Sequence, residues 1–275
     1  MTTRTRFGVR LMVCAAVLLT AGISRADDDR DRGRCAGLPT HAQLKTALDA
    51  AVAAETSGLN NHMWATVVNR DGIVCAVAFS GANRAAQWPG SRVISAQKAS
   101  TANAFSLDSS SSSNGSGQAS GLALSTANLY SAVQPGGSLY GLQHSNPVDP
   151  EVGYKGPSQH YGTSNDPMVG EKIGGVNVFG GGLGLYNNQR ALIGGLGASG
   201  DTSCADHNIA WRVRHSLNLD FLAGVGGVSG DAARPDNIVF DITPNPNGGT
   251  GISAGGFGHP TCLNTSGSDT LPAVQ

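Results

Sequence analysis

The sequence predicts an α+β fold, an antiparallel five-stranded sheet with helices packed on it. Apolar residues recur at helical spacing in three segments of the 275-residue chain, whereas short apolar runs typical of strands occur in two groups. Within each group the runs follow one another closely. This spacing is typical of antiparallel hairpins, because parallel strands need long crossover connections. Helices before, between and after the two groups then cover the sheet.

The N-terminal residues have the order of a secretory signal peptide. Three arginines precede the apolar run 11–22, which is too short to cross a bilayer as a helix. We place the cleavage after Ala26, so that Cys14 is lost with the signal peptide, residues 1–26. The charged segment 27–37 is expected to be a disordered lead-in. The mature protein is therefore predicted to be periplasmic or secreted, with no membrane association after cleavage.

Four cysteines remain after this cleavage: Cys35, Cys75, Cys204 and Cys262. An even number of cysteines in an exported protein favours disulfides over free thiols or metal ligands, although spacing alone does not establish the connectivity. We favour a Cys204–Cys262 bridge, because it would hold a weakly structured tail beside the last helix. The remaining pair is then Cys35–Cys75.

The segment after the lead-in predicts a helix and a hairpin. Thr40 and Gln43 form a capping box, and apolar residues then recur at helical spacing until Gly58. Strands are expected at 64–68 and 73–79, because an Asp-Gly sequence between them supplies the positive φ angles that a tight turn requires.

The middle of the chain alternates between structured and polar segments. A second helix is expected from about Ser91, with Lys98 near its middle. The Ser/Gly-rich segment 108–121 breaks all periodicity and indicates a flexible insertion. Residues 122–133 are compatible with a further helix. Residues 134–174 are rich in Gly and Pro, and so long a loop in a compact domain is usually functional or disordered.

The following segment predicts three more strands and a last helix. The strands are expected at 176–179, 183–186 and 191–198, and the helix runs from about Ser203 to Leu217. Along this helix Ala205, Ile209, Val213 and Leu217 share one face. A C-terminal extension, residues 220–275, follows.

Two of these segments together resemble a known family. Ser91–Phe105 has the sequence SRVISAQKASTANAF, and Gly175–His207 joins apolar strands, a tight turn and a glycine-rich strand exit to a polar helix start. Over residues 38–219 the chain resembles the GlcG/HbpS-like haem-binding proteins, also called the haem-degrading domain family. The resemblance implies a profilin-like or PAS-like sheet, a homo-oligomer, and association with haem or a related tetrapyrrole.

Other ligand classes have weaker support. Gly195–Gly200 formally matches the dinucleotide fingerprint and Asp220 follows at a suitable distance, but a dinucleotide fold needs a parallel strand where residues 221–231 are glycine-rich coil. We interpret these glycines as allowing close approach of a helix to the strand. The net charge of −1 and the lack of a basic stripe argue against a nucleic-acid partner. Metalloprotease, nucleophile-elbow and P-loop motifs are absent from the sequence.

The start of the last helix is a candidate anion site. Ser203 and Asp206 form a predicted capping box, and the free N–H groups after Thr202 favour a carboxylate, such as a haem propionate. The alternative is that these residues only cap the helix. His207 is expected on the face of Trp211 and away from the apolar stripe. It would there ligate haem iron or another metal, or carry a proton, unless it is simply solvated.

Lys98 and Arg92 lie in the segment that resembles the family's second helix. A lysine amid small apolar residues must reach solvent or meet an anion, and the resemblance favours the anion. His144 in the long loop is a further candidate ligand-binding residue. His62, before the first strand, is a further candidate metal ligand. We expect the ligand between the second helix and the start of the last helix, with the loop around His144 as its boundary.

The sequence therefore favours an exported haem- or tetrapyrrole-binding protein, with haem degradation or iron capture as associated roles. The alternative is an enzyme that acts on a small organic acid, in which Lys98 and Arg92 hold the carboxylate while His207 and Asp206 move a proton. A third interpretation is an assembly protein without a ligand. Whether the chain is an enzyme is left open at this point.

Overall fold

The computed structural model describes residues 1, 34–111, 121–249, 251–264 and 270–275. The predicted signal peptide beyond residue 1, most of the lead-in and most of the Ser/Gly-rich insertion lie outside the described residues. Contacts divide the chain into residues 1–36 and Gly37–Gln275. The fold described below is that of the second unit.

The main sheet has four antiparallel strands in the order β2-β1-β4-β3. Two hairpins, β1–β2 and β3–β4, are joined where β1 pairs with β4 from Trp64↔Ser199 to Asn69↔Gly194. The strands are β1 (Trp64–Asn69), β2 (Val74–Phe79), β3 (Gly182–Tyr186) and β4 (Leu192–Ser199). The antiparallel hairpin prediction is thus confirmed, with one strand fewer than expected.

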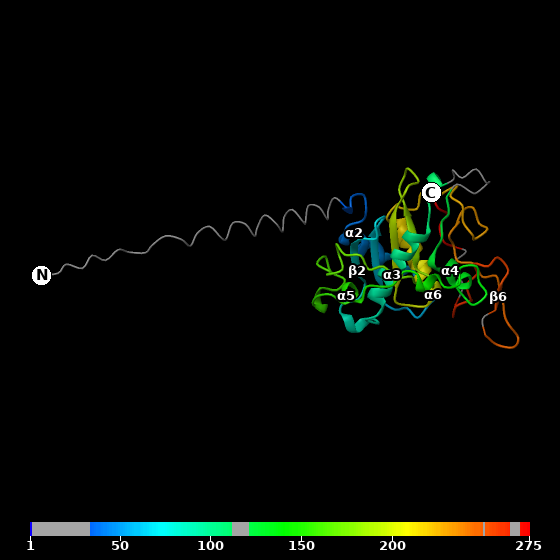
Figure 1. Ribbon diagram of the computed structural model, residues 1–275, viewed down its shortest axis with the longest axis horizontal. Coiled ribbons are helices and arrows are strands. Elements are labelled where there is room, and N and C mark those ends of the chain that lie inside the picture. The colour runs from blue at the N-terminus through cyan, green and yellow to red at the C-terminus, as the bar shows by residue number, and fades with distance from the viewer. Residues whose placement is uncertain (2–33, 112–120, 250, 265–269) are drawn as a thin grey trace. The chain divides into compact units, whose positions relative to one another are not determined.

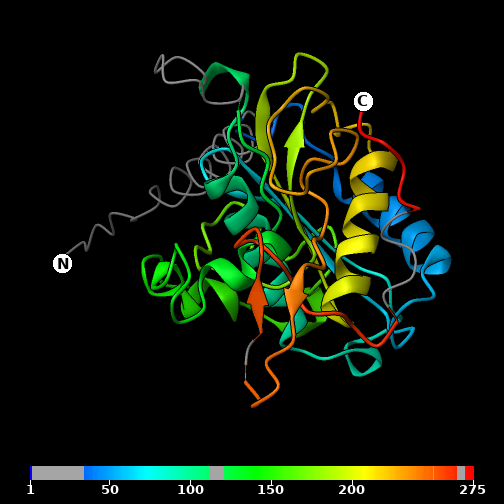
Figure 2. The same cartoon turned by 90° about the vertical axis from the view of Figure 1, so that its right-hand side faces the viewer.

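Helices cover both faces of this sheet (Figure 1). On one face α2 (His41–Ala54) and α6 (Ser203–Ser216) lie side by side, as Figure 2 shows for the blue and yellow helices. On the other face α3 (Ser91–Phe105) crosses β4, β1 and β3. Because both faces are covered, nearly every strand residue is buried, and the strands appear in the sequence as continuous apolar runs rather than alternating ones.

The predicted fifth strand at 176–179 is wrong. This segment crosses α3 and bonds to side-chain hydroxyls instead of to a neighbouring strand: the Asn177 N–H donates to Thr101 Oγ1 at 2.9 Å, and Thr126 Oγ1 donates to the Phe179 carbonyl at 2.6 Å. At its end the Phe179 ring covers the ammonium of Lys98, with Nζ 3.6 Å from the ring centroid.

The helix α3 packs directly on the backbone of β4. A Cβ atom at Gly197 would collide with the carbonyl oxygen of Ser95, and one at Gly195 would collide with that of Ala99. The dinucleotide-like glycines therefore serve close helix–strand packing, as we interpreted them, and no parallel strand follows α6 in the part of the chain that the structure describes.

The long loop and the C-terminal extension are ordered against the domain. The loop contains η4 (Leu142–His144), α5 (Pro150–Gly153) and η5 (Ser158–His160), and the further helix expected before it is only η3 (Thr126–Asn128) followed by α4 (Leu129–Ala132). Short elements η1 (Arg84–Ala86) and η2 (Ser109–Ser111) precede these. The extension pairs β5 (Ile242–Thr243) with β6 (Ile252–Ser253).

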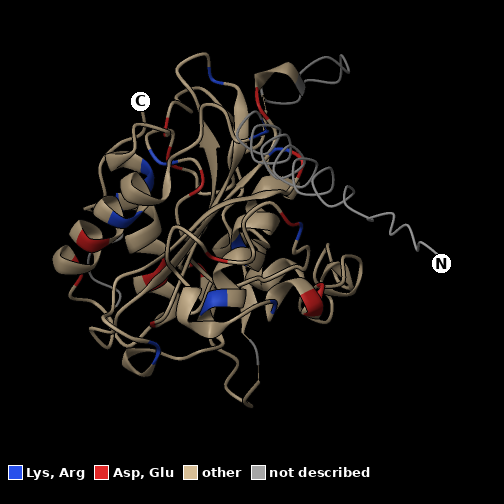
Figure 3. Ribbon diagram, turned by 90° about the vertical axis from the view of Figure 1, so that its left-hand side faces the viewer, with Lys and Arg blue, Asp and Glu red and all other residues tan. Residues whose placement is uncertain are grey.

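The predicted Cys204–Cys262 disulfide is present, with a Cα–Cα distance of 6.1 Å, and it joins the extension to α6. Cys35 and Cys75 are disulfide-bonded as well. Charged residues are sparse and of mixed sign along the ribbon (Figure 3). Among the described residues, no helix is long and apolar enough to cross a membrane.

Candidate functional site

The structure pairs Lys98 with Asp206, and we call these two residues and the adjacent His207 the buried centre, although the His207 ring contacts Asn237 and Trp211 instead. Lys98 Nζ lies 2.6 Å from Asp206 Oδ2 and also donates to the Ala198 carbonyl at 3.1 Å. All three side chains are fully buried. Lys98 therefore meets an anion, as one alternative predicted, but that anion is a carboxylate of the same chain.

Burial controls the protonation of this centre. Loss of hydration lowers the pKa of Lys98 to about 8, although the Asp206 carboxylate acts in the opposite direction. Burial likewise raises the pKa of Asp206 to about 6, against the attraction of the Lys98 ammonium. In both groups the cost of desolvation exceeds the gain from the partner, as is common for buried ion pairs.

His207 lies on the face of Trp211, as expected, with ring centroids 5.9 Å apart, but it is not solvated, because the C-terminal extension covers that face of α6. His207 Nε2 is 3.2 Å from Asn237 Oδ1, which can only accept, so Nε2 carries the proton. Nδ1 has no hydrogen-bond partner among the described residues. Burial lowers the pKa of His207 to about 4 and keeps the ring neutral.

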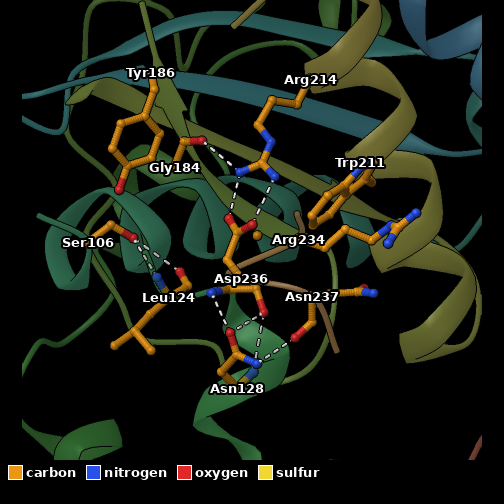
Figure 4. Close-up of polar contacts among 12 residues, drawn as sticks. Ser106, Leu124, Asn128, Gly184, Tyr186, Trp211, Arg214, Arg234, Asp236 and Asn237 are labelled. Carbon is orange, nitrogen blue, oxygen red and sulfur yellow. Dashed lines mark hydrogen bonds and ion pairs between the residues drawn. The ribbon is translucent and has the colours of Figure 1, made fainter. Parts of the chain in front are cut away.

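Figure 4 shows how the extension is held at this place. Asp236 forms a buried two-point ion pair with Arg214 of α6, at 2.5 and 2.9 Å, and Arg214 also donates to the Gly184 carbonyl at 3.2 Å. Asn128 donates to the carbonyl of Asn237 at 2.9 Å. The partners were missed from the sequence, although an arginine on a helix as buried as α6 is a signal that an acid must face it.

The start of α6 differs from the predicted capping box. The N-cap is Thr202, whose hydroxyl accepts the Ala205 N–H at 3.4 Å. Ser203 instead accepts the Gly180 N–H at 2.6 Å and contacts His259 Nε2 at 2.7 Å. These groups are therefore engaged within the chain, which leaves few donors at this helix end for the predicted anionic ligand.

Arg92 and His144 are not part of the buried centre. Arg92 is buried in an ion pair with Asp166 of the long loop, with Nε 2.8 Å from Oδ2, and lies over the Tyr161 ring at 3.6 Å. His144 is exposed in η4. Because Lys98 and Arg92 are both paired internally, the geometry gives no support to an organic-acid site built on them.

A different region is open to a ligand, and we call it the aromatic cavity. It has a volume of about 670 Å³ and lies between α2, the outer ends of β1 and β2, and residues 158–164. Trp64 and Phe79 stack at 4.2 Å between ring centroids in its wall, and Tyr161 also lines it. Its cationic and histidine groups are Lys45, Arg84 and His41.

Two histidines are associated with this cavity. His41 Nε2 lies 2.9 Å from the Gly162 carbonyl, so it donates there and leaves the lone pair on Nδ1. His62, a predicted metal ligand, is exposed, and its ring meets that of Phe79 edge-on at 6.3 Å. His62 was predicted as a metal ligand and His41 was not, because the loop that brings Gly162 to His41 is distant in the chain.

Glycine 162 makes this arrangement possible. It has a φ of 75°, and a Cβ atom there would lie 2.6 Å from Phe79 Cβ and 2.9 Å from the Trp64 ring. Only glycine allows the loop backbone to approach the two rings and present its carbonyl to His41.

Comparison with known proteins establishes the family of the chain. The family model described as haem degrading protein HbpS-like matches residues 40–214. The chain belongs to the HbpS-like family. Two solved structures are similar to this HbpS-like chain: the Klebsiella pneumoniae protein ORFY, at 24% identity and TM-score 0.40, and a PduOC–haem complex, at 23% and 0.41. The matches cover 65% of this chain and 90% and 91% of the other two. No protein with a curated description matches.

Proposed function

We propose that this HbpS-like protein binds haem or a related tetrapyrrole, and that the ligand enters the aromatic cavity rather than the buried centre. The observation that carries the proposal is the cavity itself, whose wall combines stacked aromatic rings with a histidine and two cations. Its volume falls within the range of about 300–1,000 Å³ that is usual for cofactor sites.

The groups in the wall suit the parts of a haem. Tyr161 offers the most accessible apolar contact to a planar macrocycle, since Trp64 and Phe79 line the cavity with only 2% and 7% of their surfaces exposed. Lys45 and Arg84 offer positive charge for the propionates, and Arg84 already donates to Ser158 Oγ at 2.6 Å across the cavity rim. The Nδ1 atom of His41 carries a lone pair that could ligate iron. When bound, haem would supply an iron centre capable of redox chemistry.

The test is absorption spectroscopy, first of protein purified without added ligand and then during a titration with hemin. We expect a Soret band whose growth saturates at one hemin per site. Ala82→Trp should abolish this band, because residue 82 is exposed and lines the cavity, so that an indole there fills it. His41→Ala should lower the affinity at least tenfold and shift the Soret maximum.

The matched control is Ala53→Trp, which adds the same indole to an exposed position near the other end of α2. It should bind hemin like the wild type. Absence of a Soret change in the wild type would overturn the haem proposal. Wild-type binding by Ala82→Trp and His41→Ala would overturn the placement in the aromatic cavity.

We further propose that the protein is exported and forms a homo-oligomer. Export is supported by its disulfide-bonded cysteines, since structural disulfides persist in oxidising compartments. The oligomer follows from the family resemblance, and light scattering of the mature protein at micromolar concentration would test it.

A further inference from the structure

A second cluster of side chains joins α6 to the C-terminal extension. The ligand atoms of Cys204, His259 and Cys262 all lie within 4.8 Å of one another. Cys204 lies in the first turn of α6, and the other two residues come from the extension. The two sulfur atoms are bonded to each other in the structure. The cluster is separate from the residues that line the aromatic cavity.

The imidazole of His259 is held in the tautomer that a metal requires. Its Nδ1 lies 2.7 Å from the carbonyl oxygen of Pro260, which only accepts, so Nδ1 carries the proton. The lone pair is therefore on Nε2, where the Ser203 hydroxyl donates to it at 2.7 Å. Histidine ligands of metals generally donate their other N–H to a carbonyl or carboxylate in this manner. The ring is almost completely buried, which fixes its orientation.

The surroundings of the sulfur atoms also suit metal ligation. The backbone N–H of Cys204 is 3.2 Å from Sγ of Cys262 and can donate to it. Such a donor in the first turn of a helix stabilises a thiolate, which is the form that binds metals. Once the disulfide is reduced, two thiolates and the Nε2 lone pair of His259 would therefore surround a single metal position.

We propose that reduction of the Cys204–Cys262 bridge converts this cluster into a Cys₂His site for a divalent metal, with Zn²⁺ as the expected ion. A thiol reductant supplies two electrons and two protons, the S–S bond breaks to give two thiols, and the reductant becomes a disulfide. Metal binding then releases both thiol protons, and water or the Ser203 hydroxyl completes a tetrahedral set. The metal would keep the extension attached to α6 after the bridge is lost.

The experiment uses Co²⁺ as an optical probe in the Cys35→Ser/Cys75→Ser variant of residues 27–275, in which Cys204 and Cys262 are the only cysteines, with no haem added. After anaerobic reduction, a Co²⁺ titration should produce sulfur-to-cobalt charge-transfer absorption and the visible bands of tetrahedral cobalt. Saturation is expected at one ion per chain. Zn²⁺ should abolish the bands, and oxidised protein should show none.

Substitutions assign the ligands. Cys204→Ser and Cys262→Ser should each remove the charge-transfer absorption, and His259→Ala should weaken Co²⁺ binding at least tenfold. His144→Ala, at an exposed histidine, is the matched control and should bind like its parent. Absence of the bands in reduced protein would overturn the proposal, whether or not circular dichroism shows a native fold. Unchanged bands in His259→Ala would also overturn it.

An independent measurement follows the bridge itself in the same variant. In a glutathione redox buffer, alkylation and mass spectrometry give the reduced fraction of Cys204 and Cys262. Zn²⁺ should shift the equilibrium at least tenfold toward the thiols relative to buffer with chelator, because only the reduced form binds the metal. No shift would contradict the proposal.

Discussion

The buried centre and the aromatic cavity contain the same kinds of groups, cations and a histidine, in opposite states. In the buried centre, Lys98 and His207 have no exposed surface, and carboxylate and amide groups of the same chain contact them. In the aromatic cavity, Lys45 also has a carboxylate partner, Asp49, and His41 donates to the Gly162 carbonyl, but both side chains line open space. Charged side chains on a buried helix can thus satisfy one another within the chain, so that they need no ligand. The groups available for binding are those that still border open space after they have formed their contacts within the chain.

Removing one member of the ion pair in the buried centre should cause the largest loss in the free energy of unfolding. Lys98→Met leaves the Asp206 carboxyl buried without its main partner, and we expect a loss of about 3–5 kcal/mol in the free energy of unfolding. The double variant Lys98→Met/Asp206→Leu should recover most of this loss. Urea denaturation at pH 7 gives the free energies of unfolding of the wild type, the single variant and the double variant.

Lys155→Met is the control for this comparison, because Lys155 forms an exposed ion pair with Glu171. Its expected cost is below about 1 kcal/mol. If Lys98→Met cost no more than this control, the buried centre would be accessible to water in solution, and the contrast between the two regions would disappear.

Lowering the pH should change the stability of the protein in opposite directions through His207 and Asp206. His207 has a folded-state pKa of about 4 against an ordinary value of 6.5, so between these pH values the unfolded chain binds a proton that the folded chain does not. Stability from this group therefore falls as the pH falls from 6.5 to 4, by about 3 kcal/mol. Asp206, with a raised pKa of about 6, changes stability in the opposite direction over nearly the same range.

His207→Gln removes the first contribution and keeps the second. The unfolding free energy of this variant minus that of the wild type should therefore rise by about 3 kcal/mol between pH 6.5 and pH 4. Urea titrations at the two pH values measure the difference. A constant difference would mean that His207 gains a proton without unfolding, and so that the extension opens over it.

The aromatic cavity should respond to charge removal in binding and not in stability. Lys45→Met and Arg84→Met are each expected to weaken hemin binding several-fold, by about 1 kcal/mol, because their ammonium and guanidinium groups lie at an open rim. The effect should decrease at high salt. Lys155→Met again serves as the control and should leave the affinity unchanged. Equal effects of all three variants would indicate non-specific attraction instead of a site.

Local rules predicted much of the fold. The capping box of Thr40 and Gln43 and the Asp-Gly hairpin were found from the sequence, because each depends on residues within a few positions. The Cys204–Cys262 bridge was predicted because it would hold a weakly structured tail beside the last helix. The prediction of a strand at 176–179 was wrong, because a short apolar segment whose backbone bonds to side-chain hydroxyls has the same composition as a strand.

The candidate site was predicted less well, for a physical reason. The burial of His207 depends on Asn237, and the pairing of Arg92 depends on Asp166, 74 positions along the chain. Helical periodicity describes which residues share a face, but it does not say what covers that face. The aromatic cavity was missed in the same way, since its wall joins Trp64 to Tyr161 across the whole second helix and the long loop.

The glycine contacts between α3 and β4 have a mechanical consequence. Where side chains separate a helix from a sheet, rotamer changes let the two layers slide. At Gly195 and Gly197 the backbones of α3 and β4 touch with nothing between them. These two elements must therefore move as one rigid body. Residues 158–164 in the wall of the aromatic cavity are tied to this body, because Tyr161 lies under Arg92 of α3 and the Gly162 N–H donates to Asp166, the partner of Arg92.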